Sequence, residues 1–414
     1  MPAGAFRLLR LPVTALSPHA LPVSKDLPRA QRPLKDFFAL HLLANQFPAL
    51  HGLRALAVVS VLQIHITVSL HAIGLVTDPA LHQRSISVWF GMDLFFFLSG
   101  FLIGTILIPS HEGTRGGIGR FYVRRMFRIV PPYYVVLTLL AVMLPATPEQ
   151  LAGLPFEYAY LHNYHLFPVS PLMPWAWSLC VEEHFYLAVP LVAALLTALP
   201  RPSWRIGALV MLWLAGLGVR YAIFASRPSW TPAEMFADIY FRTHARFDIL
   251  VAGLLLAYVQ RAYAHSMRKA LEPRLRQLAL ATVPAFCAWA LLGPLALRHD
   301  LSTIFAWGTV TSVMYFTLVL LVINTESPVT RWLSSRWFLR FATLGYGVYL
   351  VHPVVIGGVV APAAFALAYR FHLPLLLVWW ASLAMLLVLA SAAAYVLHIL
   401  VEKPALYIRD RVAR

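Results

Sequence analysis

The stretch HGLRALAVVSVLQIH, residues 51–65, is almost entirely apolar but keeps Arg54 near one end and His65 at the other. The apolar run continues to about residue 72, so it is long enough for one membrane-spanning helix, which needs about 20 residues. On a helix that rises about 1.5 Å per residue, the two side chains lie roughly 16 Å apart. Because an ionisable group inside a membrane costs about 2.5–3.5 kcal/mol, each is a candidate functional residue.

Two interpretations of this pair are open. In the first, Arg54 forms a positively charged entrance at the cytoplasmic edge of the membrane, and His65 is a titratable group near or beyond the middle of the membrane. In the second, Arg54 only extends to lipid phosphate, and His65 hydrogen-bonds to a neighbouring helix. The pair alone does not favour either interpretation.

The composition of the whole chain agrees with a membrane location. Of the 414 residues, 60% are hydrophobic and 12% are charged, and the mean hydropathy is +0.71, whereas soluble domains average about 25% charged residues. Ten apolar runs are long enough to span a bilayer. They lie near residues 50–72, 88–109, 129–146, 177–199, 206–225, 238–259, 277–297, 301–323, 341–361 and 372–400. The sequence therefore predicts an all-α polytopic membrane protein with about ten transmembrane helices.

Lysine and arginine are distributed unequally between the connections. Alternate connections, including both ends of the chain, hold 25 of these residues, and the intervening ones hold 4. Positive charge favours the cytoplasmic side, so both termini are predicted to be cytoplasmic. The net charge of +16 does not indicate nucleic-acid binding, because topology and anionic lipid explain basic residues on one membrane face.

The chain is predicted to form one membrane domain, residues 50–407. Residues 1–49 are basic and rich in proline and lack the apolar core of a cleaved signal peptide, so we expect a disordered cytoplasmic extension. Residues 408–414 form a basic cytoplasmic tail. The two cysteines have no partner at the spacing of a metal site, so no metal site is predicted.

Two further segments place charge near the first helix. GMDLFFFLSGFLIG places Asp93 among aromatic residues in the second span, where a carboxylate is expected to be protonated or to seek a cation such as His65. RFYVRRMFRIVPPYY places Arg124, Arg125 and Arg128 within about one turn. Such a cluster suits a nucleotide-like phosphate ligand, although topology alone also explains it and is the simpler interpretation.

Two other spans carry charge at helical spacing. In PWAWSLCVEEHFYL, Glu182 shares a face with Ser178 and Tyr186, as in a hydrogen-bonding wall for a polyol; the alternative is an interfacial cap. In YFRTHARFDILVAG, Arg242 and Arg246 are predicted i, i+4 neighbours that need carboxylate partners or an anionic ligand. The acids at hand are Asp93, Glu182 and Glu183.

The ninth span, LGYGVYLVHP, carries Tyr349 and His352, and the alternative for His352 is an ordinary packing histidine. Taken in order, seven segments of the chain resemble the acyltransferase 3 family of bacterial membrane acyltransferases, over about residues 45–407. These segments are RALAVVSVLQIH, GMDLFFFLSGFLI, RRMFRIVPPYY, WSLCVEEHFYL, HARFDILVAG, LGYGVYLVHP and VEKP. Each is weak alone, and their order makes the resemblance specific.

The resemblance implies a ten-helix enzyme of the bacterial inner (plasma) membrane that moves an acyl group, commonly acetyl from acetyl-CoA, to a hydroxyl of a carbohydrate. The family's motif of arginine, ten residues and histidine falls on Arg54 and His65, with the histidine catalytic. The arginine pair of the family falls on Arg125 and Arg128, and its glutamate-to-tyrosine motif falls on Glu182 and Tyr186. The chain departs from the family at Cys180, His184 and Gly345.

These residues suggest a mechanism. His65 is the expected general base, since histidine can take a hydroxyl proton near neutral pH, and Asp93 is expected to orient it. The arginines at 54, 124, 125 and 128 are expected to bind the phosphates of CoA. Glu182 and Tyr186 would contact acceptor hydroxyls, Arg242 or Arg246 an oxyanion, and Tyr349 and His352 the substrate.

Three alternatives remain at the level of sequence. The acceptor is a cell-surface or secreted polysaccharide, or else a small glycosylated metabolite such as a macrolide. A proton-coupled transporter also keeps histidines, acids and arginines at depth. A non-catalytic scaffold would tolerate the loss of these charges together.

Overall fold

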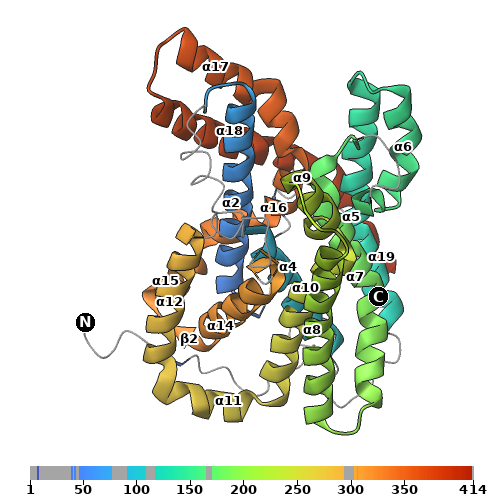
Figure 1. Cartoon of the computed structure of the whole chain (residues 1–414), viewed down its shortest axis with the longest axis vertical. Coiled ribbons are helices and arrows are strands. Elements are labelled where there is room, and N and C mark those ends of the chain that lie inside the picture. Colours follow the sequence, from blue (N-terminus) through green and yellow to red (C-terminus); the bar gives the residue numbers. More distant parts are fainter. Residues whose placement is uncertain are drawn as a thin grey trace, which may run out of the picture.

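The computed structural model describes residues 7–8, 39–40, 42, 46–76, 91–108, 117–164, 170–292, 303–304 and 306–412. These residues are almost entirely helical, and Figure 1 shows long helices packed side by side. The long helices are α2 (Ala49–Ala72), α4 (Gly91–Leu107), α5 (Gly117–Met143), α7 (Trp177–Ala198), α8 (Pro202–Ala225), α10 (Thr243–Ala262), α12 (Leu275–Leu292), α14 (Thr311–Asn324), α16 (Arg336–Val355) and α18 (Leu375–Leu397).

Short helices connect or extend these. The α-helices among them are α6 (Pro148–Tyr158), α9 (Pro232–Met235), α11 (Ala264–Leu271), α15 (Pro328–Leu333), α17 (Ala361–Tyr369) and α19 (Lys403–Val412). The 3₁₀ turns are η3 (His162–Tyr164), η4 (Pro174–Ala176) and η6 (Glu272–Arg274). The π-helical turns are η5 (Phe236–Tyr240), η8 (Ala306–Val310), η9 (Ile356–Val360) and η10 (His398–Glu402).

The helices are long and apolar enough for a multi-pass membrane protein. Seven of the described helices or helix runs meet the length and hydropathy of a membrane span, and α10 with α11, bent by 94°, brings the number to eight. Each of the ten predicted segments contains a helix, including the shorter α4. An all-α membrane protein is therefore confirmed, while the count of ten spans and the cytoplasmic position of both termini stay predictions.

Helix α4 lies at the centre of the bundle because its glycines let α10 approach closely. A Cβ atom on Gly100 would stand 1.9 Å from the carbonyl oxygen of Leu250, and one on Gly253 would stand 2.1 Å from that of Phe97. A Cβ on Gly104 would meet Ala257 at 2.6 Å. Small residues at such crossings allow backbone contact between membrane helices. This packing holds α4 rigidly behind the site.

The connections separate into two groups. In Figure 1, α6 and α17 lie in the upper part of the molecule, α9 lies just above its middle, and α11 lies at the lower end. The first three belong to connections that the charge pattern predicts to be external, and α11 belongs to one predicted to be cytoplasmic. The arrangement is thus compatible with the predicted orientation.

The two ends of the chain contact the body of the protein where they are described. Strand β1 (Arg7–Leu8) pairs antiparallel with β2 (Thr325–Glu326). The rest of the predicted extension, up to residue 38, lies outside the described residues, so its predicted disorder stays a prediction. The predicted tail continues helix α19 as far as Val412.

Candidate active site

Arg54 faces the inside of the bundle near the N-terminal end of α2. The central carbon of its guanidinium lies 6.0 Å from the ring centre of Phe95 on α4. Its charge interacts with those of Arg125 and Glu182 and with Tyr186. Its Nε atom is buried and has no hydrogen-bond partner among the described residues. Arg54 is therefore turned toward the bundle interior, not toward lipid.

Helix α5 brings two more arginines to Arg54. The Arg125 guanidinium lies 5.0 Å from the ring centre of Tyr186, and the charge of Arg128 interacts with those of Arg54 and Arg125. Within the described residues, none of these three guanidiniums makes a hydrogen bond or an ion pair. We call Arg54, Arg125 and Arg128 the arginine cluster. Arg124 is exposed and stands apart from it.

Glu182 places a carboxyl group beside the arginine cluster. It is 5% exposed and accepts a hydrogen bond from the hydroxyl of Ser99 on α4. The Tyr186 hydroxyl lies 3.5 Å from the Ser99 hydroxyl oxygen, at the limit of a hydrogen bond. Residues four apart on a helix share a face, which places Ser178, Glu182 and Tyr186 in one row along α7. The predicted shared face of α7 is confirmed.

A narrow cavity of about 20 Å³ lies between α2, α4, α7 and α16. Val58 and Val61 of α2 line one side, one and two turns beyond Arg54, and Ser178, Glu182 and Tyr349 line the other. Most of the wall is apolar, and the space suffices for about one water molecule. The cavity therefore lies on the path along α2 from the arginine cluster to His65.

The far end of this path holds two histidines. The Nδ1 atom of His65 lies 3.0 Å from the carbonyl oxygen of Val61 and 3.1 Å from Nε2 of His352 on α16. The two ring centres are 4.7 Å apart. The Nδ1 atom of the fully buried His352 lies 2.7 Å from the carbonyl oxygen of Tyr349. The structure thus pairs the predicted base with His352.

Tyr349 closes the same end of the cavity through its hydroxyl. This hydroxyl donates its only hydrogen to the carbonyl oxygen of Trp175. Since the Ser178 hydroxyl lies 2.6 Å away, Ser178 must be the donor in their shared hydrogen bond. Ser178 therefore presents a lone pair, and no free proton, to the cavity.

Asp93 does not occupy the predicted position beside His65. It forms an ion pair with Arg246, both side chains are fully buried, and the guanidinium of Arg246 lies 4.6 Å from the ring centre of Tyr240. A charge-assisted bond to a guanidinium is stronger than a bond to a neutral imidazole. The expectation that Asp93 orients His65 is therefore corrected: Asp93 partners Arg246.

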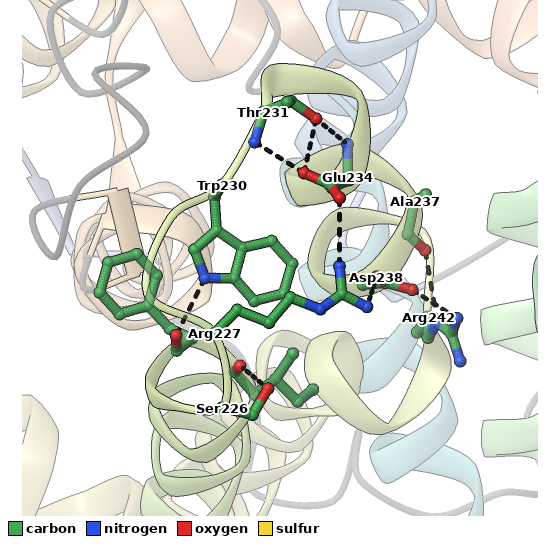
Figure 2. Close-up of polar contacts among 10 residues, drawn as sticks. Ser226, Arg227, Trp230, Thr231, Glu234, Ala237, Asp238 and Arg242 are labelled. Atoms are coloured by element: carbon green, nitrogen blue, oxygen red, sulfur yellow. Dashed lines mark hydrogen bonds and ion pairs between the residues drawn. The ribbon is translucent and has the colours of Figure 1, made fainter.

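Arg242 and Arg246 do not act as neighbours on one helix face. Arg242 is the residue before the first turn of α10, with an extended backbone, so the helix starts too late to align the two. Figure 2 shows Arg242 bonded to Asp238, beside the contacts of Arg227 with Asp238 and Glu234. The arginine at 242 belongs to this more exposed network, outside the cavity lining.

Arg220, a charged residue deep in the apolar helix α8, was not among the candidates predicted from the sequence. Its guanidinium donates to Asp248 at 2.7 Å, to the carbonyl oxygens of Ala245 and Ile304 at 2.7 and 3.2 Å, and to Thr309 at 2.9 Å. Both charged side chains are fully buried. The signal was present, because an arginine within an apolar run needs an internal partner.

Two of the departures from the family pattern contact one short segment. Cys180 lies 3.4 Å from Nδ1 of His162 in η3, and Nδ1 of His184 lies 2.7 Å from the hydroxyl of Thr243. The side-chain amide of Asn163 donates to the same hydroxyl at 3.0 Å. These residues fasten the η3 segment to α7 and α10. At the third departure, a Cβ on Gly345 would meet Val58 at an ordinary 3.4 Å.

Comparison with known proteins gives a consistent result. The profile of an acyltransferase domain, Acyl_transf_3, matches residues 47–399. O-acetyltransferase OatA of Staphylococcus aureus (strain NCTC 8325 / PS 47) is 25% identical over 346 residues, 78% of this chain and 53% of the relative. No solved structure matches the chain.

Two other relatives bear related names. Peptidoglycan O-acetyltransferase OatA of Listeria monocytogenes is 26% identical over 336 residues, 75% of this chain and 49% of the relative. Putative peptidoglycan O-acetyltransferase YrhL of Bacillus subtilis is 26% identical over 328 residues, with coverages of 75% and 48%. The chain spans about half the length of the curated relatives it matches. Because the domain profile covers most of the chain, the protein belongs to the acyltransferase 3 family.

Proposed function

We propose that this protein is an O-acetyltransferase of the inner (plasma) membrane that moves an acetyl group from acetyl-CoA to a hydroxyl of a cell-surface or secreted carbohydrate. The observation that carries the proposal is the path along α2, from the arginine cluster through the cavity to His65. The names of the relatives, two of which specify peptidoglycan, support a carbohydrate acceptor.

The arginine cluster is the proposed binding site for the CoA phosphates. Three guanidiniums repel each other, and the nearby Glu182 offsets only part of their charge. Each guanidinium has five N–H donors in a planar fork that matches phosphate oxygens. A multiply charged phosphate ligand would satisfy both the charge and the free donors.

The pantetheine arm of the donor would follow the line of the cavity toward His65, and the cavity would widen from the space of about one water molecule to admit it. The distance to cover is roughly 16 Å, from the helical rise between Arg54 and His65. Ser178 and Glu182 offer acceptor oxygens along the wall, which suits the amide N–H groups of the arm. In this proposal Glu182 contacts the donor arm, and Tyr186 supports Arg125 through its ring.

The transfer itself needs one base. His65 would take the proton from the acceptor hydroxyl, whose oxygen attacks the thioester carbonyl carbon. The carbon–sulfur bond then breaks, the ester forms, and the departing sulfur takes the proton back from His65 to leave as the free thiol of CoA. His65 lies seven residues before the end of α2 that is predicted to be external, so we propose that the acceptor approaches from that side.

The test is acceptor-dependent release of CoA from acetyl-CoA by purified protein in nanodiscs. Peptidoglycan fragments, secreted polysaccharide and a glycosylated macrolide are supplied in parallel to wild type and to His65→Ala. We expect release with a carbohydrate acceptor, lost in His65→Ala and kept in His265→Gln, which alters an exposed histidine. Equal release by wild type and His65→Ala, or proton-coupled solute uptake without CoA release, would overturn the proposal.

A further inference from the structure

We propose that His352 is a positioning residue that fixes the proton of His65 on Nδ1 and thereby leaves Nε2 as the basic nitrogen. This inference rests on the proposed function, in which His65 is the general base. It assigns to His352 a role different from the substrate contact predicted from sequence.

The first step places a proton on His352. Its Nδ1 atom lies 2.7 Å from the carbonyl oxygen of Tyr349. A carbonyl oxygen only accepts hydrogen bonds, so this nitrogen must carry the hydrogen. A neutral imidazole carries one N–H, and the Nε2 atom of His352 is therefore a lone-pair acceptor.

The second step places the proton on His65. Its Nδ1 atom faces two acceptors, Nε2 of His352 at 3.1 Å and the carbonyl oxygen of Val61 at 3.0 Å. A lone pair on Nδ1 would meet lone pairs on both sides, whereas an N–H there is shared between them. His65 is therefore held as the Nδ1–H tautomer. Its Nε2 atom makes no hydrogen bond with the residues that the structure describes.

This arrangement has a direct catalytic consequence. When Nε2 takes the proton of the acceptor hydroxyl, His65 becomes an imidazolium whose Nδ1–H still donates to His352 and Val61. A carboxylate plays this orienting part in serine hydrolases. A neutral imidazole does so here without adding a second buried charge to an apolar wall, where an unpaired charge is costly. It explains why Asp93 can pair with Arg246 instead.

The kinetic test separates orientation from mere packing. Glutamine at 352 can place an amide oxygen where the imidazole Nε2 stood and accept from His65, whereas asparagine is too short and leucine offers no acceptor. We expect His352→Leu and His352→Asn to lower kcat by about 100-fold or more, the scale of a misoriented base. The KM for acetyl-CoA should stay within about twofold of the wild-type value. The kcat of His352→Gln should be at least about tenfold higher than that of His352→Leu.

Three outcomes distinguish the failure of this inference from failure of the proposed function. If His65→Ala is inactive while His352→Leu keeps the wild-type kcat, the positioning role is overturned and the base remains. Equal losses in His352→Gln and His352→Leu would also overturn it, because packing would then explain both. If His65→Ala keeps full activity, the proposed function itself fails.

A measurement on the wild-type protein avoids dependence on variants that fold poorly. Histidine labelled with ¹⁵N reports which ring nitrogen carries the hydrogen, and the His65 signals are assigned by their loss in His65→Ala. We expect a protonated Nδ1 and an unprotonated Nε2 for His65 at neutral pH, and a mixture of tautomers in His352→Leu. A protonated Nε2 in the wild type would overturn the inference.

Discussion

Arg220 and the arginine cluster are two ways of keeping guanidinium groups inside a membrane bundle. Arg220 donates to one carboxylate, one hydroxyl and two backbone carbonyls, and so uses nearly all of its donors within the protein. Arg54, Arg125 and Arg128 stand together and make no hydrogen bond or ion pair with the described residues. The donors of Arg220 are thus engaged by the fold, whereas the described residues leave those of the arginine cluster unengaged.

The two arrangements imply different roles for a buried arginine. A guanidinium whose donors are satisfied by the fold is costly to remove and stabilises the packing of its helices. A guanidinium that lies beside other guanidinium groups, with N–H donors that are not hydrogen-bonded, is suited to bind an anion from outside the chain. We therefore propose that Arg220 stabilises the fold and that the arginine cluster binds the acyl donor. Substitutions at these residues test the two roles.

The largest effect is expected on stability, from breaking the Arg220–Asp248 pair. Arg220→Met or Asp248→Leu alone leaves an uncompensated buried charge and should destabilise the protein by about 3–5 kcal/mol. The double variant removes both charges and should recover part of that loss. Thermal unfolding in detergent, followed by loss of the monodisperse peak in size-exclusion chromatography, measures this. Additive losses in the double variant would contradict the assignment.

Removing a member of the arginine cluster should act on the donor and leave stability intact. For Arg125→Ala we expect the KM for acetyl-CoA to rise about 10- to 100-fold, the worth of a charge-assisted hydrogen bond of about 1.5–3 kcal/mol. Thermal stability should not fall, because a like charge is removed. Arg124→Ala, on the exposed side of α5, is the matched control and should change KM far less. A large loss of stability in Arg125→Ala would mean that Arg125, like Arg220, stabilises the fold.

A substitution at Gly308 tests how tightly the Arg220–Asp248 ion pair is enclosed. Its φ is +95°, and a Cβ there would stand 2.7 Å from both Arg220 and Asp248. Gly308→Ala should therefore destabilise the protein by about 1–3 kcal/mol through backbone strain and crowding. At Gly357, a Cβ would meet nothing within 4 Å, so Gly357→Ala is the control. Equal unfolding temperatures of the two variants would show that the pair is loosely held.

The smallest effect is expected from the exposed network in Figure 2. Arg242 is 28% exposed and pairs with Asp238, and ion pairs near water contribute about 0–1 kcal/mol. Arg242→Ala should therefore lower stability by less than about 1 kcal/mol. Chemical unfolding followed by tryptophan fluorescence is sensitive enough to measure it. A loss comparable to that of Arg220→Met would mean that burial does not determine the role of these arginines.

The features that depend on one helix could be predicted from the sequence. Helical spacing placed Ser178, Glu182 and Tyr186 on one face and set Arg54 and His65 along one path. Pairings between helices could only be narrowed to candidates, because they depend on which faces pack together. Asp93 was one of three acids expected to partner Arg246 and does pair with it, whereas its expected contact with His65 is absent and His65 contacts His352.

The start of a helix was a second source of error. The predicted alignment of Arg242 with Arg246 assumed one continuous helix, but α10 begins at Thr243. Boundaries of this kind depend on local backbone conformation and are the least certain part of any pattern in a sequence. The role of Arg220 was missed because its partner Asp248 lies on another helix.

We propose that donor binding and proton transfer occur at opposite ends of one path along α2. Calorimetric titration of acetyl-CoA into purified wild type, His65→Ala and Arg54→Ala, without acceptor, tests it most directly. We predict that His65→Ala binds acetyl-CoA as tightly as wild type although it does not turn over, and that Arg54→Ala binds at least about tenfold more weakly. Undiminished binding by Arg54→Ala, or no binding by wild type, would contradict the account.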